Sequence, residues 1–365
     1  MTTEPRLVIT AWSAVSPYGI GRESFVDGIA SSTSTVTELD QDLWQGPTSR
    51  GCLVPGFDIR EVLGAKGTRK MDRVTALVVS TVGQLLADGG ISTGEDTALV
   101  LGSTMGSAQS IMDFTKDVLV RELPYLVDPA KMPNSVMNCA AGACAIWHGL
   151  KGPNTTLAGG QAAGLMALDY ARRLLIHDRA AKVLVGAAEE YSTERAWLDR
   201  HSWPAETPDR VLGEGCAVLL VETADQAALT GGRTPLAEVL ATESRVYLEG
   251  DPTKVLIACV QSVLARAGVR ADEVWAAVPS SVGDRGRLES GVVRSLFGAE
   301  VVDRVPTGDV LGDTGAASAA LRIAAVLSVA EHSPEAAGRV ALVTSADRYG
   351  TVACSLLRLA DPASS

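Results

Sequence analysis

The sequence predicts a layered α/β protein whose chain runs through two successive sets of strands and helices. Short apolar runs alternate with longer amphipathic segments along the whole chain, and this alternation is typical of helices packed on buried sheets. The loop at 227–234, which contains Gly231-Gly232-Arg233, interrupts the pattern and separates the two sets. Because no low-complexity linker divides the chain, we expect the halves, 1–226 and 235–365, to share one continuous core.

The first set is expected to contain four buried strands with helices between them. Short apolar runs predict the strands at Leu7–Thr10, Ala98–Leu101, Lys182–Gly186 and Ala217–Val221. Apolar residues at helical spacing predict helices at Met71–Ala87, Ser107–Leu123, Ser135–Leu150 and Gln161–His177. The segment from Lys151 to Gly164 is expected to form a buried strand and a turn that leads to a pocket.

The second set follows the same alternation. Apolar runs predict strands at Leu236–Ala241, Val274–Val278, Val340–Ser345 and Thr351–Leu359. Helical spacing predicts helices at Thr253–Gly268, Glu289–Phe297 and Gly315–Glu331, of which the last is rich in small residues. Two sets of this kind indicate an internally duplicated architecture, although no repeat strong enough to prove it is visible in the residues themselves.

Composition and charge narrow the functional class. The chain has 365 residues, of which 46% are hydrophobic and 21% are charged, so it is long enough to form well-buried cores. Its formal net charge of −11 argues against nucleic-acid binding, which calls for clustered cations. The compact basic groups, Arg69-Lys70 with Arg73 and Arg172-Arg173, are expected to be solvated helix faces; a weak contact with an acidic carrier protein is the alternative.

No segment of the sequence points to a membrane or to secretion. No apolar run reaches the roughly 18–20 residues that cross a bilayer, and the stretch 1–6 contains no apolar segment of a signal peptide. We therefore expect a soluble protein of the cytoplasm that has no membrane partner.

Metal and cofactor sites are not expected either. The cysteines are scattered without a C-x-x-C pair and are expected to be small core residues: Cys52, Cys139, Cys144, Cys216, Cys259 and Cys354. The histidines form no i, i+4 pair and no H-E-x-x-H pattern: His148, His177, His201 and His332. No glycine-rich loop has the Walker or Rossmann spacing, so the sequence predicts no bound cofactor.

Several short motifs follow one another along the chain. They are Ala14–Gly21 after the first strand, Lys70–Arg73, the stretch from Asn134 to Asn154, the small-residue turn Leu157–Gly164, and Gly213-Glu214-Gly215 before an apolar strand. In this order the motifs resemble the β-ketoacyl synthase family, and the resemblance runs over nearly the whole chain. It implies the thiolase fold, in which two duplicated α/β halves form a layered α-β-α-β-α core.

The resemblance also shows which reactive groups are missing. At the family's nucleophilic cysteine this chain has Gln161, and at its two histidines the chain has Ser280 and Asp309. The lysine before the second histidine falls on Arg304. The late glycine-rich loop that faces the cysteine is eroded as well and reads Asp347-Arg348-Tyr349-Gly350. These positions are therefore expected to be vestigial, and we expect no catalytic residues.

Condensation cannot proceed with these replacements. A turn-to-helix junction such as that at Gln161 stabilises a thiolate, but a neutral carboxamide gains no activation there and cannot form a thioester. The loss of one oxyanion donor alone typically costs about 10²–10³ in rate. We expect Gln161 to fill the former cysteine pocket and to hydrogen-bond the neighbouring backbone. The pair Glu189-Glu190 is expected to cap an exposed loop rather than to perform acid–base chemistry.

Three functions are compatible with an inert pocket. The first resembles the chain-length factor of type II polyketide synthases, which typically has glutamine at the cysteine position and lacks the catalytic histidines. The second is a malonyl-carrier-protein decarboxylase that supplies the starter unit; it keeps the histidines, so Ser280 and Asp309 argue against it. The third is a scaffold subunit that holds a synthase together without sensing chain length.

A chain-length factor would pair with an active ketosynthase and would work on a chain carried by an acyl carrier protein. The resemblance places the end of the acyl tunnel on the helix that follows 102–106. The gate residues are then Ala108, Ile111 and Met112, for each of which ordinary core packing is the alternative. The resemblance places the dimer interface within 134–150, at Asn134, Met137, Asn138 and Cys139.

The stretch Trp197–Pro208 is short for the family. This length indicates that a surface loop near the pocket has been trimmed. It also favours a branch that makes linear polyenes over one that makes folded aromatic polyketides.

Overall fold

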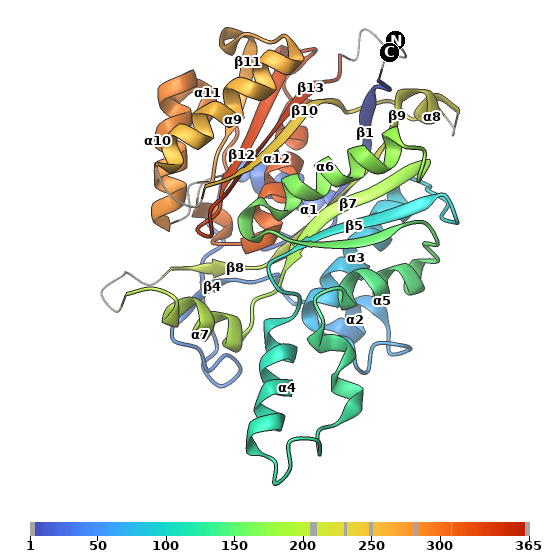
Figure 1. The fold of residues 1–365 in the computed structure, drawn as a ribbon, viewed down its shortest axis with the longest axis vertical. Helices are drawn as coiled ribbons and strands as arrows, with labels where there is room; N and C mark the ends of the chain where they lie inside the picture. Colours follow the sequence, from blue (N-terminus) through green and yellow to red (C-terminus); the bar gives the residue numbers. More distant parts are fainter. Residues whose placement is uncertain are drawn as a thin grey trace.

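One mixed sheet runs through the protein, whose computed structural model describes residues 4–204, 210–229, 232–247, 251–280, 283–307 and 309–361. Its strand order is β11-β12-β13-β10-β1-β9-β7-β5-β6, and β2 (Gly19–Ile20) pairs with β1 (Figure 1). The first half supplies β1 (Leu7–Ser16), β5 (Thr97–Ser103), β6 (Asn154–Ala158), β7 (Lys182–Glu189) and β9 (Gly215–Thr223). The second half supplies β10 (Ala237–Val246), β11 (Val274–Val278), β12 (Val340–Ala346) and β13 (Thr351–Leu359).

The pairing of the strands repeats from one half to the other. In the first half β5 and β7 are parallel, while β7–β9 and β9–β1 are antiparallel. In the second half β11 and β12 are parallel, while β12–β13 and β13–β10 are antiparallel. The halves join where β1 pairs with β10, with Val8 opposite Glu238. This repetition confirms the duplicated architecture, and the division at 227–234 stays a prediction.

Helices cover both faces of each half-sheet. One outer layer holds α3 (Arg73–Asp88) and α5 (Cys139–His148), and the other holds α9 (Pro252–Ala267) and α10 (Gly283–Phe297). Between the half-sheets lie α6 (Ala163–Ile176) and α12 (Ser318–Glu331), which share one apolar cluster with strands of both halves. The layers therefore follow the order α-β-α-β-α, as the resemblance implied.

Strand residues alternate between the inner and the outer cores. On β5, Leu99 and Leu101 pack with the outer helices, whereas Ala98 and Val100 pack with α6 and α12. Successive side chains of a strand point to opposite faces, so both faces of these strands are buried. This double burial explains why the strands appear in the sequence as continuous apolar runs.

The two inner helices touch through small side chains. A Cβ atom added to Gly164 on α6 would lie 3.0 Å from the backbone nitrogen of Ala320 on α12. A larger side chain at either position would push the helices apart and open the shared core. The small-residue composition of the predicted helix at 315–331 therefore reflects this close contact.

Several elements differ from the predictions. The helix predicted at 135–150 is shorter and forms only α5; a 3₁₀ turn, η2 (Pro133–Ser135), precedes it. The strand predicted within 151–164 is β6, which lies at the edge of the sheet and is only partly covered, so the expectation of a buried strand is wrong. The predicted 227–234 loop begins within a helix, α8 (Ala224–Leu229), and Gly231 lies outside the described residues.

Several short elements escaped prediction because their apolar runs are brief. The helices are α1 (Arg22–Ser31), α2 (Ile59–Leu63), α7 (Thr193–His201) and α11 (Ala299–Asp303). A second, small sheet consists of β3 (Thr37–Glu38), β4 (Arg50–Cys52) and β8 (Leu212–Gly213). The remaining 3₁₀ turns are η1 (Pro129–Lys131), η3 (Gly160–Ala162), η4 (Ala271–Glu273), η5 (Asp309–Leu311), η6 (Gly315–Ala317) and η7 (Pro334–Ala336).

The helix α4 (Ala108–Val120) projects from the layered body (Figure 1). Ala108, at its first position, is the buried residue of this helix. The rest of α4 extends away from the sheet together with the segment that leads through η1 and η2 to α5. Within the described part of the chain, no helix combines the length and the apolar character needed to span a bilayer.

Arg73, expected on a solvated face, forms a buried ion pair. Its guanidinium group makes two hydrogen bonds of 2.6 Å to the carboxylate of Glu214 and a third, of 3.2 Å, to the carbonyl oxygen of Phe57. Glu214 is buried and also accepts hydrogen bonds from the backbone nitrogens of Val54 and Tyr191. The motifs at 70–73 and 213–215 thus hold each other in place across the fold.

Replacing Arg73 with methionine is expected to lower the free energy of unfolding by about 3–5 kcal/mol, because Glu214 would remain buried without its cation. Urea denaturation of the purified variant measures this loss. Arg69→Met, on the exposed turn before α3, is the matched control and should stay within about 0.5 kcal/mol of the parent protein. Equal stability of the two variants would contradict the structural role given to the pair.

Candidate functional site

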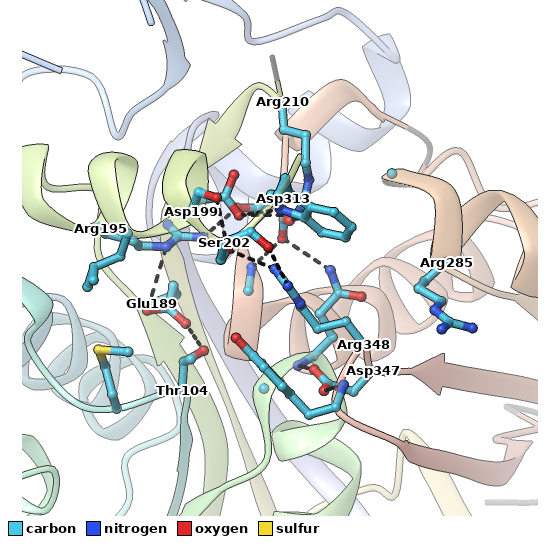
Figure 2. A pocket seen from close by; sticks show the side chains of 18 of the residues that line it. Thr104, Glu189, Arg195, Asp199, Ser202, Arg210, Arg285, Asp313, Asp347 and Arg348 are labelled. Atoms are coloured by element: carbon cyan, nitrogen blue, oxygen red, sulfur yellow. Dashed lines mark hydrogen bonds and ion pairs between the residues drawn. The ribbon is translucent and has the colours of Figure 1, made fainter. Parts of the chain in front are cut away.

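A cavity of about 260 Å³ lies where the strands β5, β7 and β12 end and the turns η3 and η6 begin (Figure 2). Thr104 follows β5, Gln161 lies in η3 before α6, and Glu189 ends β7. From the second half come Asp313, before η6, and Asp347, in the turn between β12 and β13. Segments far apart in the sequence therefore meet at the carboxyl ends of parallel strands, which is the usual place for a site in α/β folds.

Gln161 lies in this cavity between two carboxylates. Its side-chain Nε2 donates a hydrogen bond of 3.2 Å to Asp313 Oδ1, and its backbone nitrogen donates one of 3.0 Å to Asp347 Oδ2. The turn before it is tight: Gly160 has φ +49°, and a Cβ atom there would collide with the Asp347 carboxylate. The side chain of Gln161 was expected to bond the neighbouring backbone, but its partner is a carboxylate from the other half of the chain.

Two arginines fill the polar side of the cavity. Arg210 forms ion pairs with Asp313 and, at 3.0 Å, with Asp199. Arg195 donates hydrogen bonds to the carbonyl oxygens of Gly213 and Asp313, at 2.7 and 2.8 Å. These contacts occupy the polar side of the cavity and hold α7 against the turn that precedes η6.

The turn at 347–350, expected to face position 161, does border the cavity. Arg348 donates hydrogen bonds of 2.8 Å to the hydroxyl and to the carbonyl oxygen of Ser202. Its guanidinium carbon also lies 4.1 Å from the ring centre of Trp203, within the range of a cation–π contact. Arg348 therefore ties this turn to the segment after α7 at the mouth of the cavity (Figure 2).

The expectation that Glu189 and Glu190 cap an exposed loop is wrong. Their exposed fractions are 2% and 1%: Glu189 is the last residue of β7, which is buried along its whole length, and Glu190 follows it. Glu189 accepts hydrogen bonds from Thr104 Oγ1 and from the backbone nitrogen of Ala316. Glu190 points to the first turns of α3 and α4, where it accepts hydrogen bonds from the backbone nitrogens of Val74 and Gln109 and from the hydroxyl of Ser107. Burial raises the pKa of Glu190 to about 8, and the nearby Asp72 carboxylate adds to the shift.

Of the four positions that the resemblance marks as vestigial, Gln161 is the one found among the described residues that line the cavity. Ser280 is buried but is not among the described lining residues, and its backbone nitrogen donates a hydrogen bond of 3.0 Å to Glu289 Oε1. Arg304 pairs with Glu300 at 3.0 Å and lies over the ring of Trp275. The backbone of Asp309 forms part of η5, but its side chain lies outside the described residues.

Among the described residues that line the cavity, none is a cysteine or a histidine. His148 contacts the carbonyl oxygen of Val79 at 2.9 Å, and His201 stacks on Trp197. The cysteines are free thiols, five of them buried, and Cys139 is partly exposed. No three side chains of His, Cys, Asp or Glu in the described ranges are grouped so that they could hold a metal ion.

The predicted gate residues have different surroundings. Ala108 is buried and lines the same cavity as Gln161. Ile111 is half-buried and Met112 is exposed, and neither belongs to the described cavity lining.

The predicted interface residues lie at the start of α5 rather than along it. Asn134 lies in η2 and donates to the carbonyl oxygen of Lys70 at 2.7 Å. Met137 and Asn138 are exposed in the turn before the helix, and Cys139 is its first residue.

The charged groups of the cavity were not predictable from the sequence, chiefly Arg195, Asp199, Arg210 and Asp313. Gln161 and Asp313 are 152 positions apart in the chain, and no local pattern pairs them. One available signal was the stretch Trp197–Pro208, which was placed near the pocket. Leu198, Asp199, Ser202 and Trp203 do line the cavity, and residues 205–209 lie outside the described part.

The chain is similar to known proteins of one family. The family model for the N-terminal domain of β-ketoacyl synthases matches residues 4–227. The solved structure of the ishigamide ketosynthase/chain length factor has a TM-score of 0.93 and 48% sequence identity, over 97% of this chain and 99% of that one.

Curated relatives are more distant in sequence. The granaticin polyketide putative beta-ketoacyl synthase 2 of Streptomyces violaceoruber is 26% identical over 96% of this chain and 92% of its own length. The 3-oxoacyl-(acyl-carrier-protein) synthase 2 of Vibrio cholerae is 26% identical over 62% of this chain, and the match spans only 60% of that relative. The family model and the 48% identity over nearly the full chain show that the protein belongs to the β-ketoacyl synthase family.

Proposed function

We propose that this protein is a non-catalytic chain-length-factor subunit, which pairs with an active ketosynthase and limits the length of a polyketide chain. The observation that carries the proposal is that a glutamine, and not a nucleophilic cysteine, occupies position 161. Its side chain is an amide bonded to Asp313, and no described residue lining its cavity is a cysteine or histidine. Such a subunit needs a partner for turnover. The likeness to a ketosynthase/chain length factor structure supports the same assignment.

The surface around α4 and α5 supports the pairing. Many of the exposed large apolar side chains lie between positions 105 and 147, among them Met112, Leu119, Val120, Tyr125, Ile146 and Trp147. The edge strand β6 lies next to α5 in the fold and leaves one side of the sheet unpaired within the described residues. A face of this kind is costly to leave in water. We expect a ketosynthase to cover it through an obligate interface of roughly 2,000–5,000 Å².

Chain-length control is assigned to the first turn of α4. Ala108 lines the cavity, and the helix that it begins carries the exposed apolar side chains of Met112, Leu119 and Val120. A small side chain there leaves room for an acyl chain, and a large one would remove that room. The acyl carrier protein that bears the growing chain is expected as the second partner of the complex.

Replacing Ala108 with phenylalanine is expected to shorten the product. Forcing extra atoms into a packed site costs about 1–3 kcal/mol, which corresponds to a roughly 5- to 150-fold lower share of the longest chain. Mass spectrometry of the products made by the purified heterodimer measures this share. Met112→Phe, one turn further along α4 and outside the described cavity lining, tests the second gate position, and Leu229→Phe on α8 is the matched control that should leave the distribution unchanged.

The outcome separates the assignments. An unchanged product from an intact Ala108→Phe heterodimer removes Ala108 from the gate, and a change with Met112→Phe alone moves the gate along the helix. Carbon dioxide released from malonyl-carrier protein by the purified chain alone would instead indicate the starter-unit decarboxylase. If no gate substitution alters the product, the scaffold function is the better description. The same mass spectra also test the proposal that the product is a linear polyene and not a folded aromatic polyketide.

A further inference from the structure

One buried carboxyl group joins the first turns of two helices next to the cavity. Glu190 follows the last residue of β7, and its Oε2 accepts a hydrogen bond of 3.1 Å from the backbone nitrogen of Val74 on α3. Its Oε1 accepts from Ser107 Oγ at 2.9 Å and from the backbone nitrogen of Gln109 at 3.2 Å. Ser107 is the N-cap of α4, so a single side chain holds α3 and α4 at a fixed distance.

This anchor adjoins the residue assigned to the gate. Ala108 lies between the two α4 donors, Ser107 and Gln109, and lines the cavity. Because α4 buries only this first residue among its described positions and otherwise projects from the body, its placement depends on contacts at its base (Figure 1). A shift of the Glu190 carboxyl would therefore move the methyl group of Ala108 relative to the cavity.

The charges around Glu190 come from two helices, α3 and α7, and from the end of β7. On α3, Asp72 is the N-cap and Arg73 is held by Glu214. On α7, Arg195 donates to the carbonyl oxygen of Glu190 at 2.9 Å. On its own strand, Glu189 points away, to Thr104. The facing group of like charge is thus Asp72, whose own pKa is raised by burial.

We propose that Glu190 is the positioning residue of the chain-length gate, which sets where α4 presents Ala108 to the cavity. The inference rests on the proposed function, because it assumes that Ala108 limits the product. It adds a residue that contacts neither the acyl chain nor the partner and acts through the base of α4.

Titration of Glu190 gives the anchor a pH dependence with a definite sign. Burial, followed by the charge of Asp72, raises the pKa of this carboxyl to about 8, while opening of α4 would expose it to water and restore an ordinary pKa near 4.5. The anchored state thus binds a proton that the opened state releases between these values. Anchoring of α4 is strongest below about pH 4.5, weakens as the pH rises towards about 8, and changes little above that.

The test uses Glu190→Gln in the complex with the ketosynthase. Both oxygens of a carboxyl group can accept hydrogen bonds, whether or not it is protonated, but the nitrogen of a carboxamide cannot, so at least one donor of α3 or α4 loses its partner. Hydrogen exchange, corrected for the intrinsic rates, should show protection of the first-turn amides of α4 falling by about tenfold, the scale of one lost buried hydrogen bond. The product distribution should shift, and the loss of protection that we expect in the parent protein between pH 6 and 8 should be absent from the variant.

Glu222→Gln is the matched control. Glu222 is a fully buried carboxylate on β9 that accepts hydrogen bonds from the side chains of Thr10 and Arg233. It lies near the end of β9, far from α4 (Figure 1). Its replacement should lower stability but leave the exchange of α4 and the product unchanged. If Glu190→Gln does not fold, Ser107→Ala removes one of the two α4 donors to Glu190 together with the N-cap of α4, and it should loosen α4 in the same direction.

The outcomes distinguish this inference from the proposed function. Unchanged products and unchanged α4 exchange in an intact Glu190→Gln complex, or in Ser107→Ala, overturn the positioning role. An equal product shift in Glu222→Gln overturns it too, because general destabilisation would then explain the effect. If α4 loosens but neither Glu190→Gln nor Ala108→Phe alters the product, the gate itself is wrong and the proposal fails with it.

Discussion

Replacing Ile146 with glutamate is expected to separate the protein from its ketosynthase partner. Ile146 lies on α5 with an exposed fraction of 87%, so its replacement should not disturb the fold. In the proposed interface the same side chain would be covered, and a carboxylate there would lose its water without gaining a cation. We expect the dissociation constant to rise by at least about 100-fold, or about 2.7 kcal/mol.

Size-exclusion chromatography of the co-expressed subunits, followed by titration calorimetry, measures this effect. Leu229→Glu is the matched control, since Leu229 has an exposed fraction of 79% on α8, a helix that lies apart from α4 and α5 (Figure 1). It should bind the partner like the parent protein. Co-elution of both variants with the ketosynthase would mean that α5 is not the pairing surface.

Restoring a cysteine at position 161 is expected to leave the protein inert. A helix N-terminus stabilises a thiolate by about 0.3–1 kcal/mol, and by about 2 kcal/mol at best. Two unit charges about 4 Å apart interact by about 4 kcal/mol at a typical effective dielectric constant. The carboxylates of Asp313 and Asp347 lie within hydrogen-bond distance of Gln161, so their repulsion outweighs the helix, even though Arg210 offsets part of the charge of Asp313.

We therefore expect Gln161→Cys to form no acyl adduct and to react with iodoacetamide at least about ten times more slowly than an exposed thiol. Intact-protein mass spectrometry after incubation with an acyl carrier substrate measures the first quantity, and the rate of alkylation measures the second. Adding Asp347→Asn removes one of the two charges and should raise the alkylation rate. Rapid acylation of the single variant would refute the view that the pocket has lost its chemistry.

The regular elements were predictable because their apolar residues recur at the spacing of a helix or form the short runs of a buried strand. The apolar spacing of 253–268 and the small residues of 315–331 place α9 and α12 almost at their observed bounds. The elements that escaped, such as β4 and α7, have short or polar segments whose burial depends on neighbours from elsewhere in the chain.

The site was predictable only where one position has a chemical meaning of its own. The amide at 161 excludes a thioester whatever surrounds it. The residue types of the other charged groups indicate no particular role by themselves. Arg195, Arg210 and Asp313 meet only because η6 and α7 approach each other in the fold. The pair Glu189-Glu190 was misplaced for the same reason: two adjacent carboxylates are usually solvated. Here donors that lie more than 80 positions away in the chain bury both of them.

By itself the sequence determined the α/β class, the likeness to β-ketoacyl synthases and the absence of a nucleophile at Gln161, because each follows from residue type and local spacing. The tertiary structure decided that Ala108 and Gln161 line one cavity, that ion pairs fill its polar side, and that Glu190 anchors the base of α4. These features depend on hydrogen bonds and close contacts between segments remote along the chain, and such contacts exist only once the layers have packed.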